Sequence, residues 1–321
     1  MGRYIIRRVL QAIPLLFLLS IAMFGLIHLI PGGADAVLFN PRLTAAARAA
    51  LRVRMGLDDP FYIQYVKWIS AALTGNFGFS FVTNEPVSAI LARRFPATFE
   101  LFGIAFFVAL ALAILIGVSS AVRQGTATDY SLTILAYVGI SLPAFLLGLF
   151  LQNIFGVWLH WLPTSGTGSY GGAVLSPFDS LLDRLAHLIL PVTALSILFI
   201  AGWSRYMRSS MIEVVKQDYM RTARAKGVGP TTLLVRHALR NAVIPLITIV
   251  ALDFGAIAGG ATITEGVFAW PGMGLLFIDS LDARDYPVLI AMLVLSAFFV
   301  IAFNLIADIL YGVMDPRIRY S

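Results

Sequence analysis

Residues 101–122 have the sequence LFGIAFFVALALAILIGVSSAV, an uninterrupted run that contains no Asp, Glu, Lys or Arg. A helix of about 20 apolar residues is long enough to cross the hydrocarbon core of a bilayer, which is about 30 Å thick. Three other stretches of comparable length also lack charged residues, namely 9–30, 131–159 and 186–204. We therefore predict four helices that each span a membrane without burying a charge.

Two further stretches are apolar but carry polar residues. The stretch 242–264 contains Asp253, and the stretch 288–310 contains Asn304 and Asp308 near its end. Of all residues 59% are hydrophobic and only 12% are charged, unlike the composition of ordinary soluble proteins. The predicted fold class is an all-α polytopic membrane protein with about six transmembrane helices in a single transmembrane domain.

The formal net charge of +6 and the lack of cysteine narrow the function classes. The basic residues are distributed along the loops and form no platform with aromatic residues, so the sequence predicts no nucleic-acid partner. A membrane surface explains the excess of positive charge better. Without cysteine the chain has no disulfide, no thiolate metal site and no cysteine nucleophile.

The N-terminus has the pattern of a secretory signal peptide, because Arg3, Arg7 and Arg8 precede an apolar run and Ala34-Asp35-Ala36 follows it. Signal peptides have an apolar core of about 7 to 15 residues. The run 9–30 is longer and suffices to span the bilayer. We therefore expect it to remain as the first transmembrane helix.

The basic residues of the short loops predict the orientation. The segment 205–241 contains eight Lys or Arg residues but only two acidic residues, Glu213 and Asp218. Loops rich in Lys and Arg lie in the cytoplasm, so this segment and, with six spans, both termini are predicted there. The segment 31–98 is then an external insertion, because segments of more than about 60 residues cross largely regardless of charge.

The external insertion is predicted to form a small helical cap between the first two transmembrane helices. Thr44 suits the start of a helix that ends at Gly56, and Asp59-Pro60 suits the start of a second one. The apolar residues of this second helix recur at steps of three and four, at positions 62, 63, 66, 69 and 73. Gly75-Asn76-Phe77-Gly78 then ends it.

Short motifs of enzyme chemistry indicate no activity. The segment 166–171, GTGSYG, matches the dinucleotide-binding fingerprint, but it lies in a predicted external loop without the strand and helix that this chemistry needs, so we interpret it as a turn. The chain contains no G-x-x-x-x-G-K-[ST], no H-E-x-x-H and no G-x-S-x-G. The four histidines, at positions 28, 160, 187 and 237, lack a metal-binding spacing, and we predict structural or interfacial roles for them.

Acidic residues inside apolar segments are candidates for function, because a charge in the bilayer costs several kcal/mol. Asp253, mid-way along its helix, is a candidate to line a pathway, and the alternative is an Asp that packs between helices and is either protonated or hydrogen-bonded to another subunit. Asp308 and Glu265 lie near helix ends and are predicted to be interfacial. Gly255 and Gly259 form G-x-x-x-G, which allows helices to pack closely.

The cytoplasmic segment predicts a helix-turn-helix. Residues 217–227 suit a short helix that ends at Gly227, and Gly229-Pro230 suits the turn. A second helix is predicted to start near Thr231 and to kink at Pro245 before the fifth span. Small residues interleaved with basic ones suit docking into a groove of a partner protein, and a polybasic lipid-binding loop explains the same residues equally well.

A resemblance decides between these alternatives. Tyr219 to Gly227, with Pro245 beyond, resembles the cytoplasmic signature of membrane subunits of binding-protein-dependent ATP-binding-cassette importers, in particular the oligopeptide and dipeptide permease group. The other matching residues, in order along the chain, are Arg7-Arg8, Ile30-Pro31-Gly32, Gly56-Leu57-Asp58, Gln64-Tyr65, 185–191, Gly259-Gly260, Glu265, Phe268, Pro271-Gly272, Asp285-Tyr286-Pro287 and Asp315-Pro316-Arg317. The chain departs from the family at Asn76, where Asp is frequent, and it lacks the leading Glu of the signature, with Asp218 nearby.

The resemblance implies a multi-pass permease subunit of an ATP-driven peptide importer in the bacterial inner membrane. Its implied partners are a second homologous permease subunit, two cytoplasmic ATPase subunits or domains, an extracytoplasmic peptide-binding protein and membrane lipid. The chain itself is then not an enzyme and holds no cofactor or metal, because the ATPase subunits bind the ATP and magnesium.

The resemblance also implies roles for individual residues. The ATPase-coupling residues, within a cytoplasmic coupling segment 205–241, are Asp218, Arg221, Thr222, Ala223, Arg224, Ala225, Lys226 and Gly227. The candidate residues of the substrate pathway are Asp253, Gly259, Gly260 and Glu265.

Other solutes and other mechanisms stay open at this point. Permeases similar to this chain carry dipeptides, longer peptides, glutathione, nickel complexes or sugars, and peptide is the expected majority case. A proton-coupled secondary transporter is one alternative, in which Asp253 carries the proton. An intramembrane enzyme that uses Asp253 and Asp308 as an aspartyl pair is the other.

Overall fold

A computed structural model describes residues 2–29, 58–168 and 176–314, together with the single residues 44, 46, 49, 52 and 53. Its regular elements within these residues are helices, and two residues, Phe79 and Pro86, form an isolated β-bridge. The first elements are α1 (Gly2–Leu29), α3 (Phe61–Leu73), α4 (Val87–Val122), α5 (Ala127–Ser141), α6 (Ala144–Leu151) and the π-helix η2 (Gln152–Trp158). The later elements are α7 (Pro177–Val215), α8 (Asp218–Ala225), α9 (Pro230–Thr232), the π-helix η3 (Leu233–Leu239), α10 (Arg240–Gly255), the 3₁₀-helix η4 (Ala256–Gly259), α11 (Thr262–Val267), α12 (Met273–Asp282) and α13 (Tyr286–Met314).

Four helical stretches of the described residues are long and apolar enough to cross a membrane. They are Val87–Val122, Pro177–Val215, Pro230–Gly255 and Tyr286–Leu310. A bent pair of helices within 127–158 gives a fifth candidate, and α1 contains a shorter apolar stretch, Leu10–Ala22. The all-helical, polytopic class is therefore confirmed, with four or five candidate spans in this part of the chain.

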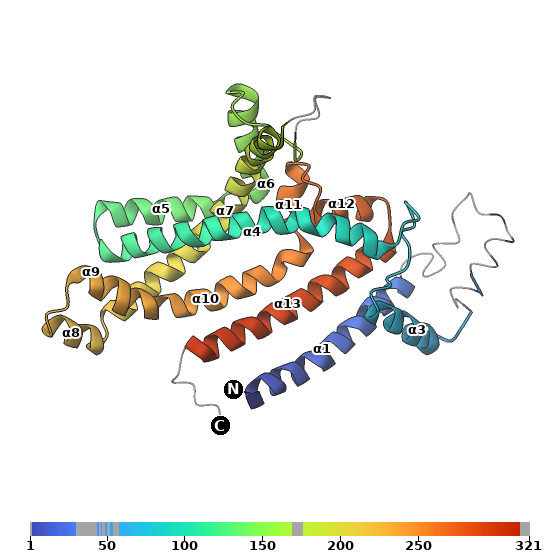
Figure 1. Cartoon of the computed structure of the whole chain (residues 1–321), viewed down its shortest axis with the longest axis horizontal. Coiled ribbons are helices and arrows are strands. Elements are labelled where there is room, and N and C mark those ends of the chain that lie inside the picture. The colour runs from blue at the N-terminus through green and yellow to red at the C-terminus, as the bar shows by residue number, and fades with distance from the viewer. Residues whose placement is uncertain are drawn as a thin grey trace.

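The predicted third span, 131–159, is not one continuous helix. The helices α5 and α6 meet at an angle of 103°, so that α6 turns away from the bundle in Figure 1. The bend lies at Leu142-Pro143, where Leu142 has the extended backbone angles φ −83° and ψ 126°. Proline disfavours the helical conformation of the residue before it and supplies no N–H to the helix, which explains the break.

Several other predicted boundaries are also corrected. Helix α4 begins at Val87, directly after Pro86, so the helix of the second span starts 14 residues before the predicted position 101. The fifth span ends at Gly255 instead of continuing to Thr264, because η4 and a turn follow it. Both changes lie next to Pro or Gly, whose backbone properties mark helix ends.

The predicted helices of the external segment are described in part. The second one is α3, which begins one residue after Pro60 and ends before Gly75 and Gly78, both in the left-handed conformation. The first, expected between Thr44 and Gly56, lies largely outside the described residues. The second predicted helix is therefore confirmed, and residues 74–86 after it form turns with the bridge between Phe79 and Pro86.

The largest hydrophobic core lies where α4, α7 and α10 pack together. Phe106 of α4 stands edge-on to Trp203 of α7, with 5.0 Å between the ring centroids, and to Phe254 of α10, at 4.6 Å. Met207 and Met211, further along α7, are fully buried in the same cluster. Aromatic pairs at these distances stabilise a fold beyond the area they bury.

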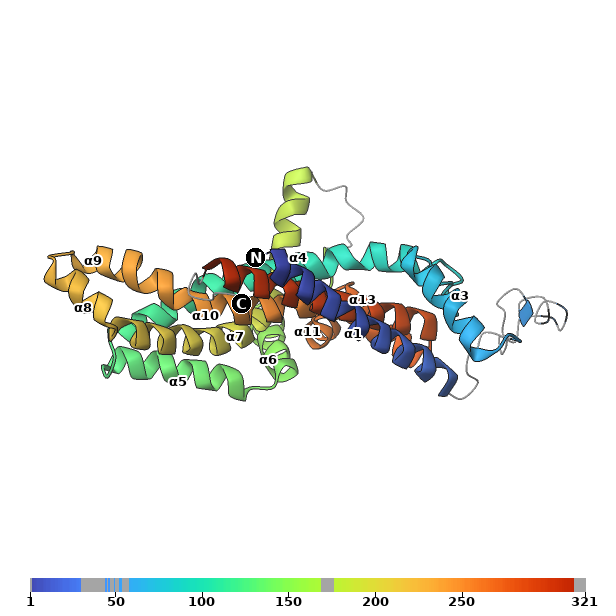
Figure 2. The same cartoon turned by 90° about the horizontal axis from the view of Figure 1, so that it is seen from below.

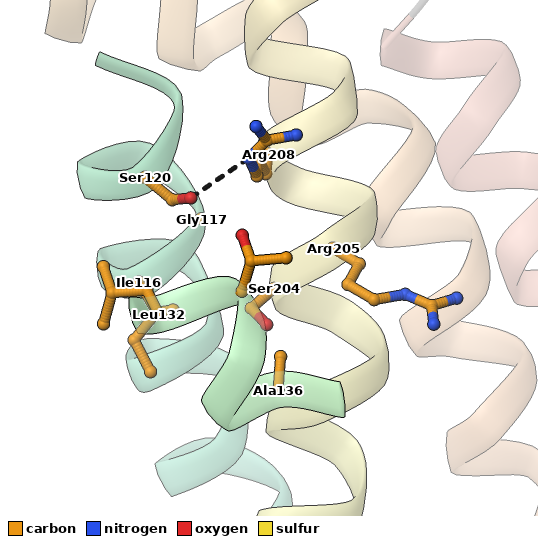
Figure 3. Close-up of a pocket in the computed structure, with 9 residues that line it drawn as sticks. Ile116, Gly117, Ser120, Leu132, Ala136, Ser204, Arg205 and Arg208 are labelled. Atoms are coloured by element: carbon orange, nitrogen blue, oxygen red, sulfur yellow. Dashed lines mark hydrogen bonds between the residues drawn. The ribbon is translucent and has the colours of Figure 1, made fainter. Parts of the chain in front are cut away.

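A buried ion pair joins α4, α5 and α7 at one end of this core. The Nε and Nη2 atoms of Arg208 each donate a hydrogen bond to Asp129, both at 2.8 Å. Asp129 is 2% exposed and accepts further bonds from the Ser120 hydroxyl and the Gly125 N–H. Figure 3 shows Ser120 and Arg208 beside a small cavity that Ile116, Leu132 and Ser204 also line. Two-point contact of this kind fixes the direction of the helices as well as their distance.

The helices form an elongated bundle. In Figures 1 and 2, α8 and α9 lie at one end of the long axis and α3 lies at the other. Helix α1 runs beside α13, and the start of α1 and the end of α13 both point towards the end that carries α8. The two predicted functional regions, at 31–98 and 205–241, thus have their described helices α3 and α8 at opposite ends.

Candidate functional site

The predicted cytoplasmic helix is α8, the first arm of a hairpin that we call the basic hairpin (residues 216–240). Gln217 has an extended backbone and α8 starts at Asp218. The helix ends at Ala225, and Gly227 follows in the left-handed conformation with φ 78°. The Gly227 N–H donates to the Arg224 carbonyl at 3.0 Å, which closes the helix end. The predicted stop at Gly227 is confirmed.

The second arm begins with proline at the first helical position. Gly229 precedes Pro230, and the chain continues through α9, η3 and α10 without a gap. The predicted turn at Gly229-Pro230 and the helix start near Thr231 are confirmed within one residue. Pro245, where a kink is expected, lies inside α10, which continues past it to Gly255.

The basic hairpin has one buried and one exposed face. Met220 is 2% exposed, and Ala223 and Val228 pack against the same core as the transmembrane helices. A hydrogen bond from the Asn241 amide to the Tyr219 hydroxyl, 3.1 Å long, links α8 to α10. The exposed residues of the predicted coupling set are Asp218, Arg221, Thr222, Arg224, Ala225, Lys226 and Gly227. The packing thus holds α8 on the bundle while its basic face stays open.

The charges of this face are weakly constrained by one another. The Arg221 guanidinium lies 3.5 Å from the Asp218 carboxylate, and these side chains are 76% and 96% exposed. Ion pairs with such exposure contribute little to stability, because water screens them. The ion pair between Arg221 and Asp218 therefore contributes little to the stability of the fold.

Asp253 contacts another helix of the same chain. Trp203 Nε1 of α7 donates a hydrogen bond of 2.7 Å to Asp253 Oδ2 of α10. Trp203 is buried, whereas Asp253 is half-buried. The predicted alternative of a hydrogen bond to another subunit is thus not needed to place this carboxylate. Its partial exposure leaves room for a second contact.

The sequence led us to expect Glu265 at an interface. In the structure its side chain is fully buried. Burial raises the pKa of its carboxyl group above the ordinary value, and the hydrogen bonds that the group accepts oppose this rise. The four donors are the Thr98 hydroxyl at 2.7 Å and the N–H groups of Ala261 at 3.3 Å, Gly274 at 2.7 Å and Leu275 at 3.1 Å. Such a side chain joins α4, α11 and α12 and does not suit the lining of a pathway.

The glycines proposed for the pathway also pack against protein. Gly260 has φ 73°, and a Cβ atom there would lie 2.3 Å from the Gly274 nitrogen. At Gly259 a Cβ would lie 3.7 Å from the Ser296 hydroxyl oxygen. Gly255, predicted to allow close packing, does so, because a Cβ there would lie 3.2 Å from the Val300 Cα of α13. The Gly260 and Glu265 positions therefore belong to one packed unit.

The candidate residues fall into separate groups. The coupling residues lie on the basic hairpin, whereas Gly260 and Glu265 are joined through α12, and Asp253 lies between these groups along α10. The structure adds polar residues that sequence reasoning missed, above all the ion pair between Asp129 and Arg208. The sequence gave one signal for Asp129, its place in the first turn of a helix that Thr126 caps.

The histidines and the glycine-rich loop have local structural contacts. His28 Nδ1 lies 3.0 Å from the Phe24 carbonyl oxygen, and His187 Nδ1 lies 2.8 Å from that of Asp183. The Gly166 N–H donates to the Phe268 carbonyl at 2.9 Å, while residues 169–171 lie outside the described part of the chain. Among the described residues no three His, Asp or Glu side chains are grouped to hold a metal.

Several helices able to span a membrane, broken helices packed within the bundle and an exposed basic hairpin define a polytopic membrane protein. The chain belongs to the family of binding-protein-dependent transport system inner membrane components. Residues 113–320 match the model of that family, and residues 1–102 match the model of its N-terminal part. It is therefore a multi-pass permease subunit of an inner-membrane importer, not an enzyme and without a cofactor of its own.

Its relatives cover the whole chain. The oligopeptide transport system permease protein AppB of Bacillus subtilis is 42% identical over 321 residues, which is all of both chains. A putative peptide permease protein of Brucella suis is 42% identical over 326 residues, again with full coverage of both. The glutathione transport system permease protein GsiC of Salmonella typhimurium is 39% identical over 321 residues, with the same coverage.

Replacing Gly260 tests the packed unit around Glu265. Gly260 has φ 73° and ψ 166°, a backbone conformation that is essentially restricted to glycine and costs another residue about 1–3 kcal/mol, and the added Cβ would meet the Gly274 nitrogen at 2.3 Å. We expect Gly260→Ala to lower the apparent melting temperature in detergent by several degrees.

Gly202→Ala is the matched control, since Gly202 is helical and a Cβ there meets no atom within 4 Å. Equal melting temperatures for the two variants would show that the contact between Gly260 and Gly274 is not tight.

Proposed function

We propose that the chain is the translocation subunit of an ATP-driven importer of dipeptides or oligopeptides and forms half of its pathway. The observation that carries this proposal is the identity of 42% over full length to an oligopeptide transport system permease. The likeness to a putative peptide permease at the same level supports it. The proton-coupled transporter and the intramembrane enzyme are set aside by the family assignment.

The proposed topology has about six spans with both termini in the cytoplasm. Helix α1 is the first span, and α3 belongs to the external insertion at 31–98. The position of α3 and of α8 at opposite ends of the long axis supports this topology (Figure 1). The start of α1 and the end of α13 point towards the α8 end, as cytoplasmic termini would.

We propose that the exposed face of α8 docks into a groove of a cytoplasmic ATPase. The supporting observation is that its basic side chains are exposed while Met220 anchors the helix in the core. The complete importer then contains this chain, a second homologous permease, two ATPase subunits or domains that bind ATP and magnesium, and an extracytoplasmic peptide-binding protein. The loaded binding protein and ATP each shift the equilibrium between the outward-open and inward-open states, because each binds one of these states more tightly than the other.

The substrate class is tested by uptake. The importer, purified with its partner subunits, is placed in proteoliposomes with ATP inside, where the ATPases face, and its binding protein outside. We expect uptake of dipeptides or longer peptides that requires ATP.

Glutathione is a separate arm of this experiment, because a permease 39% identical to this chain is a glutathione transport system protein. Uptake of glutathione without any other peptide would assign the chain to that solute. Uptake of a nickel complex or a sugar instead would refute the peptide assignment.

Charge reversal on α8 tests the docking proposal. Arg221 and Arg224 lie one turn apart on the exposed face. In the double variant Arg221→Glu, Arg224→Glu, we expect ATP-driven uptake to fall at least about tenfold. A partner surface that is complementary to the basic face would repel the two introduced carboxylates. Uptake and ATPase activity are measured together, so that loss of coupling is distinguished from loss of the complex.

The double variant Arg236→Glu, Arg240→Glu is the charge-matched control, since both residues are exposed and belong to the same hairpin but lie outside α8. It should retain uptake near the unchanged level. An equal loss in both variants would attribute the effect to total charge and would argue against a specific role for α8.

We further propose that Asp253 binds the positively charged amino terminus of a peptide in the pathway. The hydrogen bond from Trp203 fixes one carboxylate oxygen, and the half-buried side chain is compatible with contact to a solute. A charge held within apolar helices has its strongest effect on an opposite charge nearby.

Asp253→Asn keeps an acceptor for Trp203 but removes the charge. We expect the half-saturating peptide concentration for uptake to rise about tenfold, which corresponds to about 1.4 kcal/mol of lost attraction. Trp203→Phe is the companion variant, since it removes the hydrogen bond and leaves the charge. Unchanged uptake kinetics in Asp253→Asn would refute this role.

A further inference from the structure

Helix α3 has two adjacent apolar faces, of which only one is covered by the described residues. Its first face packs on α1, where Tyr65 and Trp68 stack around Phe24 with centroid distances of 5.5 Å each. The second face presents Tyr62, Val66 and Leu73, whose side chains are 67%, 59% and 82% exposed. Residues four and seven positions apart share a helix face, so these three form one stripe.

The contacts of α3 show how far along α1 it reaches. The Tyr65 hydroxyl is hydrogen-bonded to the Ser20 hydroxyl at 2.7 Å, and the Tyr65 ring stands edge-on to Phe17. At the other limit, His28 Nε2 lies 3.2 Å from the Gln64 amide oxygen. Residues 17–28 of α1 cover about 16 Å of helix, on the order of half a hydrocarbon core.

Helix α1 also exposes apolar side chains along the stretch that α3 reaches. They include Phe17, Leu18 and Ile21. If α1 is the first span, these side chains lie at the depth of the acyl chains, and α3 packs on the outer part of the same depth. Water is absent there, so an exposed apolar stripe at this depth has lipid as its natural neighbour.

A further arc of α3 carries polar residues that lie neither on the first face nor on the stripe. Lys67 forms an ion pair with Asp59, and Thr74, at the helix end, is exposed nearby. Their positions place them on the arc of the helix opposite Tyr65. A helix with one polar and one wide apolar arc is typical of elements that lie in the membrane interface.

We propose that α3 is embedded in the outer leaflet and that its stripe of Tyr62, Val66 and Leu73 binds lipid acyl chains. The helix then braces α1 from the side and keeps Lys67 and Asp59 at the headgroup level. This inference rests on the proposed topology, in which α1 is the first span and α3 is external.

Single cysteines carrying a nitroxide test this proposal, because the chain itself contains no cysteine. The variants are Val66→Cys on the stripe, Lys67→Cys on the polar arc and Leu18→Cys on α1, each in the complete importer in vesicles of phosphatidylethanolamine and phosphatidylglycerol. The unsubstituted complex gives the background from partner subunits. Collision with oxygen, which concentrates in hydrocarbon, is compared with collision with a water-soluble nickel chelate.

We expect oxygen collision to exceed nickel collision several-fold at positions 66 and 18, and the reverse at position 67. Nickel-dominated collision at position 66, with position 18 in lipid, would overturn this inference and leave the topology intact. Low collision with both reagents at position 66 would place a protein partner on the stripe and would also overturn it. Nickel-dominated collision at position 18 would overturn the topology itself.

Discussion

A backbone N–H or C=O group that faces hydrocarbon without a partner costs several kcal/mol, and this constraint governs the whole chain. A long helix satisfies this constraint with its own backbone hydrogen bonds. Where a helix breaks, other groups have to supply the missing bonds. Gln152 donates to the carbonyl oxygens of Thr164 at 2.7 Å and Val267 at 2.9 Å. Glu265 accepts from three backbone N–H groups around the breaks next to α11 and α12. Polar side chains thus replace the missing helical bonds and make the broken segments possible.

The same constraint explains how much of the fold could be predicted. A run of apolar residues without charge has to be helical in a bilayer, so the spans within α4, α7 and α13 follow from length and composition. The bend at Leu142-Pro143 does not follow, because a proline within an apolar run is compatible with a kinked span as well as with a turn of 103°. The choice between them depends on packing partners that are distant in the sequence.

Local signals predicted the basic hairpin well and the buried acidic residues poorly. Gly227 and Gly229-Pro230 specify helix ends through their own backbone preferences, which neighbours hardly change. Glu265 was expected at an interface because it lies near a predicted helix end. It is buried because it accepts a hydrogen bond from Thr98, which lies 167 residues away in the chain and is not visible from the local sequence. The partner of Asp129 is likewise Arg208, 79 residues away. Side chains satisfied by distant partners require the tertiary structure.

Helix α7 spans Pro177–Val215 and carries Pro191 in its interior, where an interior proline bends a helix. The first part of α7 stands away from the bundle in Figure 2, whereas the later part lies along the long axis and leads into α8. Residues 192–215 correspond to a rod of about 36 Å, so a swing by about 10° around its midpoint moves each tip by about 3 Å in opposite directions. A push on α8 would therefore arrive near Pro191 as a lever stroke of equal size, at the point where the helix is able to hinge.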